Sequence, residues 1–198
     1  MSYTKIDKSE ISNVLTKTND HHTGHVYLLD SNRNLILGHN KKYDNVCSFG
    51  GFSEVGETLL DTIIREFKEE SLECVFPAGD LKKLLLEDSI IITRNRDGKQ
   101  FYTAFCNVKN YKFNLEEINK NFTQALTNPD LKAGQKENDR IVIVNLDTIA
   151  NAIKLNPGAK QIVVPDITNN NCNIRDINIP AYQWFIQSLA DNNLDNMF

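Results

Sequence analysis

The side chains with the clearest potential for chemistry are three glutamates, Glu66, Glu69 and Glu70, which lie close together in the sequence. If this segment is helical, at about 100° per residue they fall within roughly 100° of one another along one border of an apolar stripe. Like charges at these spacings repel, and the macrodipole disfavours anions near the end of a helix. A bound cation would compensate for both effects, although an ordinary solvated helix face is the alternative. Because carboxylate oxygens without nearby histidine or cysteine select hard ions, the pattern favours Mg²⁺ or Mn²⁺ over zinc.

The helix that would carry these glutamates has a clear start and a clear apolar face. Thr58 and Asp61 form the capping-box pattern, which pairs the exposed amides of a first helical turn. The apolar residues that follow recur at helical spacing, in a stripe roughly 140° wide that we expect to pack on a sheet. They are Leu59, Leu60, Ile63, Ile64 and Phe67.

The stretch from Gly51 to Glu70 resembles the Nudix box, the signature of a family of hydrolases. In that pattern a glycine is followed after five residues by a glutamate and, after seven more, by Arg-Glu-apolar-any-Glu-Glu-any-Gly-apolar. The matching residues are Gly51, Glu57, Arg65, Glu66, Phe67, Glu69 and Glu70. The last two positions depart from the pattern, with Leu72 at the glycine position and Glu73 at the apolar one. Since glycine would let the helix end in a left-handed turn, Leu72 predicts either a longer helix or a different exit.

The resemblance implies a metal site and a reaction. Glu66, Glu69 and Glu70 would hold the metal ions, and the carbonyl of Gly51 would add a neutral oxygen. Mg²⁺ or Mn²⁺ bridging the oxygens of a diphosphate would neutralise charge and lower the pKa of an attacking water, whose deprotonation a glutamate would assist. The implied activity is metal-dependent hydrolysis of the diphosphate linkage in a nucleoside diphosphate linked to another moiety.

The resemblance also implies supporting residues outside the metal ligands. Arg65 and Glu57 would form an ion pair that fixes the loop against the helix and orients a catalytic carboxylate. In the family, a further acidic or amide residue often comes from a distant loop. Glu137, with Asp139 and Gln135 as alternatives, lies in such a loop and is our candidate for that catalytic position.

The rest of the chain predicts the elements around this helix, in one domain over residues 1–198. Helices are predicted at about 9–16, 114–127, 148–154 and 180–191, beside the loop and helix of 51–71. Strands are predicted at 24–30, 34–40, 46–52, 89–96, 99–108 and 140–147. Residues 165–176 are predicted to be an Asn-rich loop without regular structure. Helices mixed with hairpins favour the α/β class, and the order resembles a Nudix-like α/β/α sandwich with a mixed sheet.

Composition limits the partners that the chain could bind. A formal net charge of -4 and a pI near 5.6 argue against an extended basic surface for nucleic acid. The four cysteines are widely spaced, without a CxxC pair or a secretory leader, and we expect them to be reduced. No apolar run approaches the roughly 20 residues that span a bilayer. We therefore expect a cytoplasmic protein that binds a nucleotide-like diphosphate and no membrane.

Several other groups of residues have a functional interpretation beside a structural one. The first group, His21, His22 and His25, lacks the partners of a zinc site, although His25 and Tyr27 could face a substrate base. The cations of the second group could bind phosphate, but solvated surface is the simpler interpretation; they are Lys41, Lys42, Arg94, Arg96 and Lys99. The third group could stack on a base, but at helical spacing such residues are more often core; they are Tyr182, Trp184 and Phe185.

Two alternative functions remain beside hydrolysis of small nucleotides. The Gly50-Gly51-Phe52 opening of the box, the helical insertion at 114–127 and the last helix resemble the Nudix branch that removes RNA caps, so capped RNA is an alternative substrate. A non-catalytic domain that binds a nucleotide or a protein partner as a sensor or scaffold is the other. Such domains usually lose carboxylates of the box, and all of them are present here.

Overall fold

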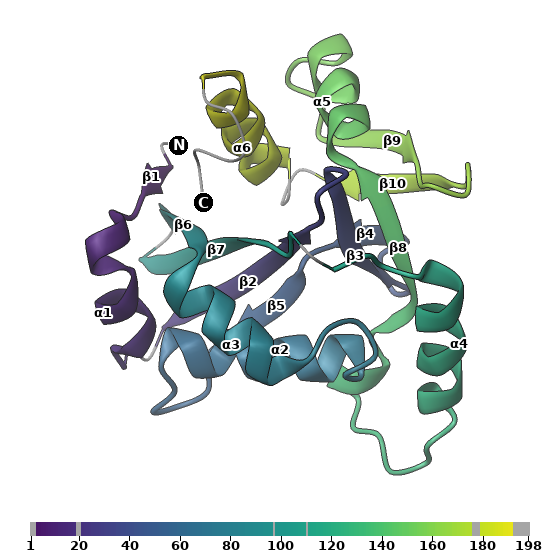
Figure 1. Cartoon of the computed structure of the whole chain (residues 1–198), viewed down its shortest axis with the longest axis horizontal. Helices are drawn as coiled ribbons and strands as arrows, with labels where there is room; N and C mark the ends of the chain where they lie inside the picture. Colours follow the sequence, from purple (N-terminus) through teal and green to yellow (C-terminus); the bar gives the residue numbers. More distant parts are fainter. Residues whose placement is uncertain (1–2, 19–20, 97, 110, 176–178, 192–198) are drawn as a thin grey trace.

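The computed structural model describes residues 3–18, 21–96, 98–109, 111–175 and 179–191. The helices are α1 (Ile11–Thr16), α2 (Leu59–Ser71), α3 (Ala78–Glu87), α4 (Leu115–Leu126), α5 (Leu146–Leu155) and α6 (Ile179–Asp191), with 3-10 turns at Lys8–Glu10 and Gly134–Lys136. The strands are β1 (Thr4–Lys5), β2 (His22–Leu29), β3 (Asn34–Asn40), β4 (Asn45–Cys47), β5 (Phe49–Phe52), β6 (Ser89–Arg96), β7 (Lys99–Asn107), β8 (Asn138–Asn145), β9 (Gln161–Pro165) and β10 (Asn171–Arg175). Helices lie on both sides of a central sheet (Figure 1), which confirms the α/β/α sandwich. Among the described residues, no helix is long and apolar enough to cross a membrane.

The central sheet is mixed, and it forks at β2. Its main order is β1-β6-β7-β2-β3-β4, with β2 and β7 parallel and the other pairs antiparallel. The first half of β2, Thr23–Val26, pairs with β5, whereas only Leu28 and Leu29 pair with β3. The chain crosses from β3 to β2 at Ser48, so the predicted single strand 46–52 is in fact two strands with different partners. Among the described residues, no strand pairs with the far edge of β5, so the fork leaves that edge open.

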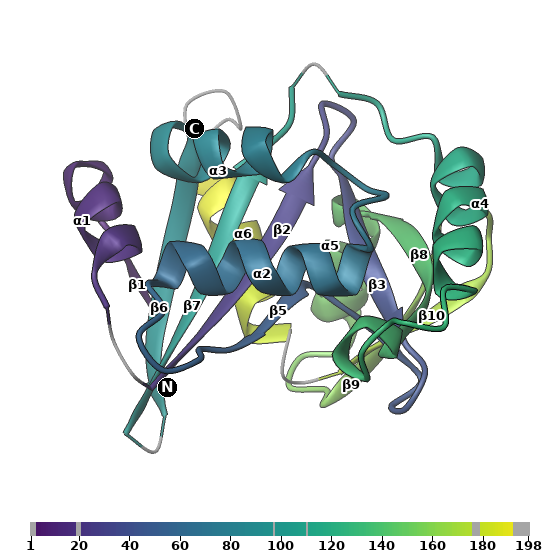
Figure 2. The same cartoon turned by 90° about the horizontal axis from the view of Figure 1, so that it is seen from below.

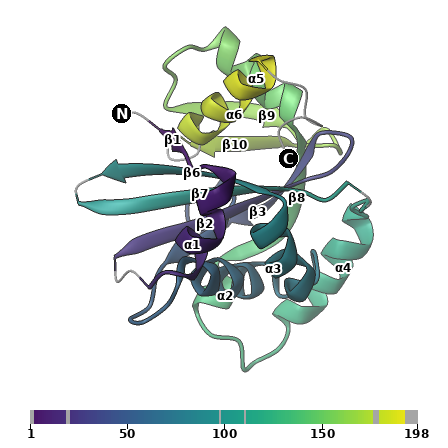
Figure 3. The same ribbon diagram turned by 60° about the vertical axis from the view of Figure 1, so that its left-hand side comes forward.

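Two apolar cores hold the layers together. On one face, α2 and α3 run side by side across the strands with α4 at the end of the sheet (Figure 2), and Val26, Ile63 and Phe67 are fully buried there. On the other face, α5, α6 and the β9–β10 hairpin cover the sheet (Figure 3). Tyr182 and Phe185 of α6 are fully buried in this second core. Alternating side chains of β2 enter the two cores in turn, as a strand covered on both faces requires.

The aromatic residues near the C-terminus belong to this second core. The rings of Phe185 and Phe105 stack with centroids 4.3 Å apart, and those of Tyr182 and Tyr27 lie 5.1 Å apart. Trp184 is partly buried beside them. The base-stacking interpretation is therefore wrong for Tyr182 and Phe185, because no ligand can reach a fully buried ring.

The elements that were not predicted from the sequence include α3, the short strand β1 and both strands of the β9–β10 hairpin. α3 follows Pro77, and its buried Leu81 and Leu85 recur at helical spacing. Of residues 165–176, predicted to be an irregular loop, 165–175 instead supply the end of β9, the turn of the hairpin and β10, and residue 176 lies outside the described residues. Asp166 organises that turn by accepting the amides of Thr168 and Asn170, which is why an Asn-rich segment can be ordered.

The exit of α2 also differs from the prediction. The helix ends at Ser71, and Leu72 follows it with φ 49° and ψ 32°, the left-handed conformation that glycine would take. Glu73 repeats it with φ 57°. The expected longer helix or different exit is wrong, because the Leu72 side chain packs against the core and compensates for the unfavourable backbone.

Replacing Glu73 by glycine should therefore stabilise the protein by about 1 kcal/mol, since left-handed backbone costs a residue with a Cβ roughly 1–2 kcal/mol. The Glu73 side chain is 65% exposed and lies 4.0 Å from the Lys68 amine, so little else is lost. Leu72→Gly is the matched variant, in which the lost core packing offsets the backbone gain. Urea denaturation measures both, and an unfolding free energy of Glu73→Gly below that of the wild type would contradict a strained exit.

Candidate active site

Helix α2 holds the candidate carboxylates in a fixed orientation. Its first turn has the complete capping box, in which Thr58 Oγ1 accepts the Asp61 amide at 3.1 Å and Asp61 Oδ2 accepts the Thr58 amide at 3.2 Å. Its apolar stripe packs on β2 and β5, as expected from the spacing. Glu66 and Glu70 therefore point toward β5.

Two glycines on β5 let these carboxylates approach the strand. A Cβ at Gly51 would lie only 2.6 Å from the carboxylate of Glu66. The Gly50 amide donates to Glu70 Oε2 at 2.7 Å, using a donor on the open edge of the strand. Gly51 thus allows the carboxylate of Glu66 to pack on the backbone, and Gly50 gives the carboxylate of Glu70 a hydrogen bond.

Arg65 is the centre of a network on the same helix. Its Nε and Nη2 donate to the two oxygens of Glu57 at 2.7 and 3.0 Å, so the ion pair implied by the box is present. Its Nη1 donates to Glu66 Oε1 at 2.8 Å, and Nη2 also donates to the carbonyl of Phe52 at 2.8 Å. Glu69 Oε2 lies 3.5 Å from Nη1. One guanidinium therefore connects the loop, the strand and the helix, as a planar fork of five donors can.

The surroundings shift the pKa values of the glutamates in opposite directions. Hydrogen bonds from Arg65 lower the pKa of Glu57 to about 2, with a smaller opposing effect of burial. Burial raises the pKa of Glu66 despite the hydrogen bond from Arg65. Burial also raises the pKa of Glu70 well above its usual value; the Gly50 amide opposes this, and the nearby charges of Glu66, Glu137 and Glu69 add to it. Perturbed groups of this kind in a cleft are candidates for functional residues.

We expect Glu57→Gln to lower the free energy of unfolding by about 1 kcal/mol at pH 7, a value reduced for solvent screening of this partly exposed pair. The pKa of Glu57 is about 2 in the folded state and about 4.3 in an unfolded chain. A depressed pKa stabilises the fold above the unfolded value, and this stabilisation disappears as the pH falls toward 2. Denaturation of both proteins between pH 7 and 2.5 should show the difference shrinking below about pH 4.3. If the difference in unfolding free energy stayed constant over this pH range, the ionised pair of Glu57 and Arg65 would be excluded as its cause.

A cleft of about 680 Å³ brings a third acidic residue to Glu66 and Glu70. Glu137, which follows the 3-10 turn before β8, lines this cleft with them, and its charge acts on both. Of the two alternatives, Asp139 Oδ1 is bonded to His39 Nδ1 at 2.7 Å, and Gln135 accepts the Lys132 amide at 2.9 Å outside the cleft. The geometry thus favours Glu137 over both.

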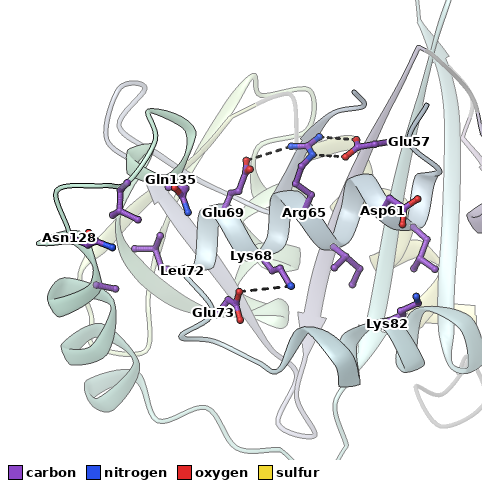
Figure 4. A pocket seen from close by; sticks show the side chains of 14 residues that line it. Glu57, Asp61, Arg65, Lys68, Glu69, Leu72, Glu73, Lys82, Asn128 and Gln135 are labelled. Atoms are coloured by element: carbon purple, nitrogen blue, oxygen red, sulfur yellow. Dashed lines mark hydrogen bonds and ion pairs between the residues drawn. The ribbon is translucent and has the colours of Figure 1, made fainter. Parts of the chain in front are cut away.

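Glu69 does not face this cleft. It lines a second cavity of about 700 Å³ on the outer side of α2, between that helix and the segment that contains Gln135 (Figure 4). A Cβ at Gly134 would lie 3.6 Å from Glu69 Oε2. Glu69 thus faces a different cavity from Glu66 and Glu70, although it contacts Arg65 and its charge acts on both of them.

The donors of the cleft fit a hard divalent cation. Among the residues that the structure describes, no three acidic, histidine or cysteine side chains have converged on one point as metal ligands. Glu66 is bonded to Arg65, and Glu70 to the Gly50 amide. The three acidic side chains are nevertheless all carboxylates. Burial raises the pKa values of Glu66 and Glu70, and the smaller contribution of their mutual repulsion is what a cation would relieve.

The histidines of β2 do not form a joint site. His22 is buried, with Nε2 3.1 Å from Thr62 Oγ1, whereas His25 lies on the other face of the strand with Nδ1 3.3 Å from Ser48 Oγ. Burial, with a smaller effect of Arg94, lowers the pKa of His25 to about 4, so its ring is neutral at pH 7. His25 lines the cleft, as one interpretation expected, but Tyr27 belongs to the core. His21 is exposed.

The basic residues fall into two groups. Lys41, Lys42 and Lys99 are exposed, as expected for solvated cations. Arg94 contradicts that expectation, because it is only 9% exposed, with its guanidinium carbon 4.7 Å from the Phe101 ring centroid. The sequence did not indicate that Arg94 is buried, because alternation along a strand shows which residues share a face of the sheet but not which face is covered. The side chain of Arg96 lies outside the described residues.

Other residues that line or adjoin the cleft could not be recognised from the sequence. Thr23 Oγ1 and Asn45 Oδ1 are buried in its wall and have no hydrogen-bond partner within the described part of the chain. Asn138 Nδ2 donates to the carbonyl of Glu70 at 3.2 Å and so holds the end of α2 against β8. Cys47, also in the wall, is a free thiol, like the other three cysteines in the described chain. Only the pairing of distant strands brings these residues together.

Comparisons with known proteins give the following. No family model and no curated protein matches this chain. A solved structure that it is similar to is a Nudix-family hydrolase from Clostridium perfringens, with a TM-score of 0.38 and 19% identity, covering 68% of this chain and 87% of that one. Another is a bifunctional NMN adenylyltransferase/ADP-ribose pyrophosphatase from Francisella tularensis, complexed with AMP and a manganese ion, with a TM-score of 0.41 and 14% identity, covering 73% of this chain and 39% of that one. At these TM-scores the likeness has no bearing on function, which rests on the residues of the site.

Proposed function

We propose that this protein is a Nudix-type hydrolase that uses Mg²⁺ or Mn²⁺ to cleave the diphosphate linkage of a nucleoside diphosphate joined to another moiety. The observation that carries the proposal is the pair of carboxylates of Glu70, which is buried, and Glu66, which is partly buried, beside Glu137 at the open edge of β5. These are residues of the box, together with one distal acid, and they share a cleft whose volume of about 680 Å³ suits a nucleotide-sized ligand.

The residues of the cleft would divide the work of the reaction. As the box implies, Glu66, Glu69, Glu70 and the carbonyl of Gly51 would hold the metal; Glu69 lines the neighbouring cavity beside Arg65 and would have to turn toward the cleft to join the other ligands. The bound metal would neutralise charge on the diphosphate and activate a water. Glu137, which comes from a different element and is exposed to the cleft, is our candidate for the proton acceptor of that water. Arg65 would keep Glu66 in place while it stays paired with Glu57.

Mass-spectrometric analysis of products is the test of this function. The protein is incubated with Mg²⁺, Mn²⁺ or EDTA and with nucleoside diphosphates, nucleotide sugars, dinucleoside polyphosphates and capped RNA. We expect metal-dependent cleavage within the diphosphate of at least one small nucleotide, and a turnover number at least about a hundredfold lower for Glu137→Gln, the lower end of what a general base contributes. Asp139→Asn, two residues away, is the matched control and should retain activity.

The outcomes separate the three candidate functions. Cleavage of capped RNA alone would replace our substrate class by the decapping alternative. Nucleotide binding without cleavage of any compound would identify a sensor and refute the hydrolase. Equal activity of Glu137→Gln and the wild type would remove Glu137 from the site.

A further inference from the structure

Arg94 is a buried cation that has no counterion among the described residues. It lies on β6 and is 9% exposed, with its guanidinium between the rings of Phe101 and Tyr3, at 4.7 and 5.7 Å from their centroids. The hydroxyl of Tyr3 is hydrogen-bonded to it. Within the described part of the chain it has no carboxylate partner. Buried charges are normally paired, and cation–π contacts compensate for only part of the lost hydration.

Arg94 lies at one end of a row of side chains that crosses the sheet to the active site. Strand register places it opposite Phe101 of β7, which is opposite Thr23 of β2, which is opposite Phe52 of β5. Directly paired residues share a face of the sheet, so the row forms one continuous surface. With strands about 4.8 Å apart, its two ends are separated by roughly 14 Å. The far end is next to Gly51, where Glu66 lies against the opposite face of the strand; the cleft reaches both faces at this edge of the sheet, because Phe52 and Glu66 both line it.

The surface of this row belongs to the wall of the active-site cleft. Thr23, Phe52 and Phe101 line the cleft, and Phe101 also lines a small space beside Arg94, together with His25 and Ser48. That space is about 30 Å³, room for one oxygen atom of a ligand. The hydroxyl of Thr23, midway along the row, is one of the buried oxygens without a partner in the described chain. The cleft therefore has an acidic end suited to a metal, and the small space next to its other end is lined by the guanidinium of Arg94, for which the described chain supplies only the Tyr3 hydroxyl as a hydrogen-bond partner.

We propose that Arg94 binds a second anionic group of the substrate, a phosphate separate from the diphosphate that is cleaved. One phosphate oxygen enters the small space and accepts from the guanidinium, while the rest of the group stays in the larger cleft. That a diphosphate bond is cleaved rests on the proposed function, whereas binding of the second phosphate at Arg94 does not depend on it. The preferred substrates are then nucleotides that carry an additional phosphate, at most roughly 14 Å from the diphosphate.

The test uses compounds that have no diphosphate, so that binding is measured separately from cleavage. Isothermal titration calorimetry compares AMP with adenosine 2′,5′-bisphosphate and adenosine 3′,5′-bisphosphate, which add one phosphate at different positions. We expect the wild type to bind at least one bisphosphate tenfold or more tightly than AMP, as charge-assisted hydrogen bonds allow. Arg94→Gln should abolish this preference, and Arg94→Lys should keep only part of it because lysine lacks the planar fork.

Arg140→Gln is the control, because it removes a cation of the same type from an exposed position on β8 and should keep the preference. Circular dichroism and thermal melting show whether each variant is folded; should Arg94→Gln fail to fold, Arg94→Met and Arg94→Lys give the same comparison. Equal binding of AMP and both bisphosphates by the wild type, or a preference that persists without Arg94, would overturn the proposal. An Arg94-dependent preference in a protein that cleaves nothing would support the anion subsite and refute only the hydrolase.

Discussion

Glu70→Gln is expected to reduce metal-dependent turnover about a thousandfold or more, the effect of losing several kcal/mol of charge stabilisation by a metal. Glutamine keeps the shape of the side chain and can still accept the Gly50 amide through its carbonyl oxygen. It cannot supply the negative charge that a divalent cation needs. The turnover number with saturating substrate, measured at increasing Mg²⁺ concentrations, is the quantity to compare.

The same variant should be more stable than the wild type when metal is absent. The folded-state pKa of Glu70 is raised above its unfolded value, so ionisation of the carboxyl disfavours the fold as the pH rises above about 4.3. Removing that charge should raise the unfolding free energy by about 1 kcal/mol at pH 7, and the melting temperature by about 2–4 °C for a chain of this size. At pH 4 and below, where the unfolded carboxyl is protonated, the gain should disappear.

The turnover number and the stability of Glu70→Gln together show whether the charge of Glu70 is functional. Replacing a residue that only supports the fold would lower stability and activity together, whereas for Glu70→Gln we expect higher stability and lower turnover. Glu73→Gln is the matched control, since this glutamate lies three residues further along and is 65% exposed. Full turnover by Glu70→Gln would exclude Glu70 from metal binding.

Arg65→Lys is expected to cost about 2 kcal/mol of stability and to lower turnover between tenfold and a hundredfold. Lysine retains the positive charge but cannot bind both oxygens of Glu57 while also reaching Glu66 and the carbonyl of Phe52. The carboxylate of Glu66 would then lose its fixed position against Gly51. Thermal denaturation and steady-state kinetics of the same preparation measure the two effects.

Lys68→Gln provides the comparison for this second prediction. Lys68 is on the same helix, 46% exposed, and its amine lies 4.0 Å from Glu73, so its removal should change stability by less than about 0.5 kcal/mol. An Arg65→Lys protein as stable and as active as the Lys68→Gln protein would show that the network around Arg65 does not position the site.

The helix of the site was predictable from the sequence because its determinants are local. The capping box at Thr58 and the apolar spacing after it specify where α2 begins and which face is buried. The fixed spacing of the box then places Arg65 within reach of Glu57, a contact that the structure contains. Each of these features depends on residues fewer than nine positions apart.

The rest of the site was not predictable because it depends on which strands pair. Nothing in the local sequence around Ser48 indicates that β4 and β5 have different partners, and the fork of the sheet is the result. The separation of Glu69 from Glu66 and Glu70 depends on where the segment near Gly134 packs. Arg94 became recognisable as buried only when β6 was placed opposite β7. The sequence pattern therefore did not contain the information on which distant strands pair with each other.

The fork of the sheet has a further consequence, for solubility. In the described chain β5 pairs with β2 alone, and an unpaired strand edge is a template on which a second molecule can add a strand and begin to aggregate. Here the Gly50 amide already donates to Glu70, and the carboxylate of Glu66 lies against Gly51, so two acidic side chains block that edge. A protein in which both glutamates are neutralised should lose this protection, and light scattering on concentrated samples would reveal it as self-association. The carboxylates proposed to bind the metal would thus also keep the molecule monodisperse.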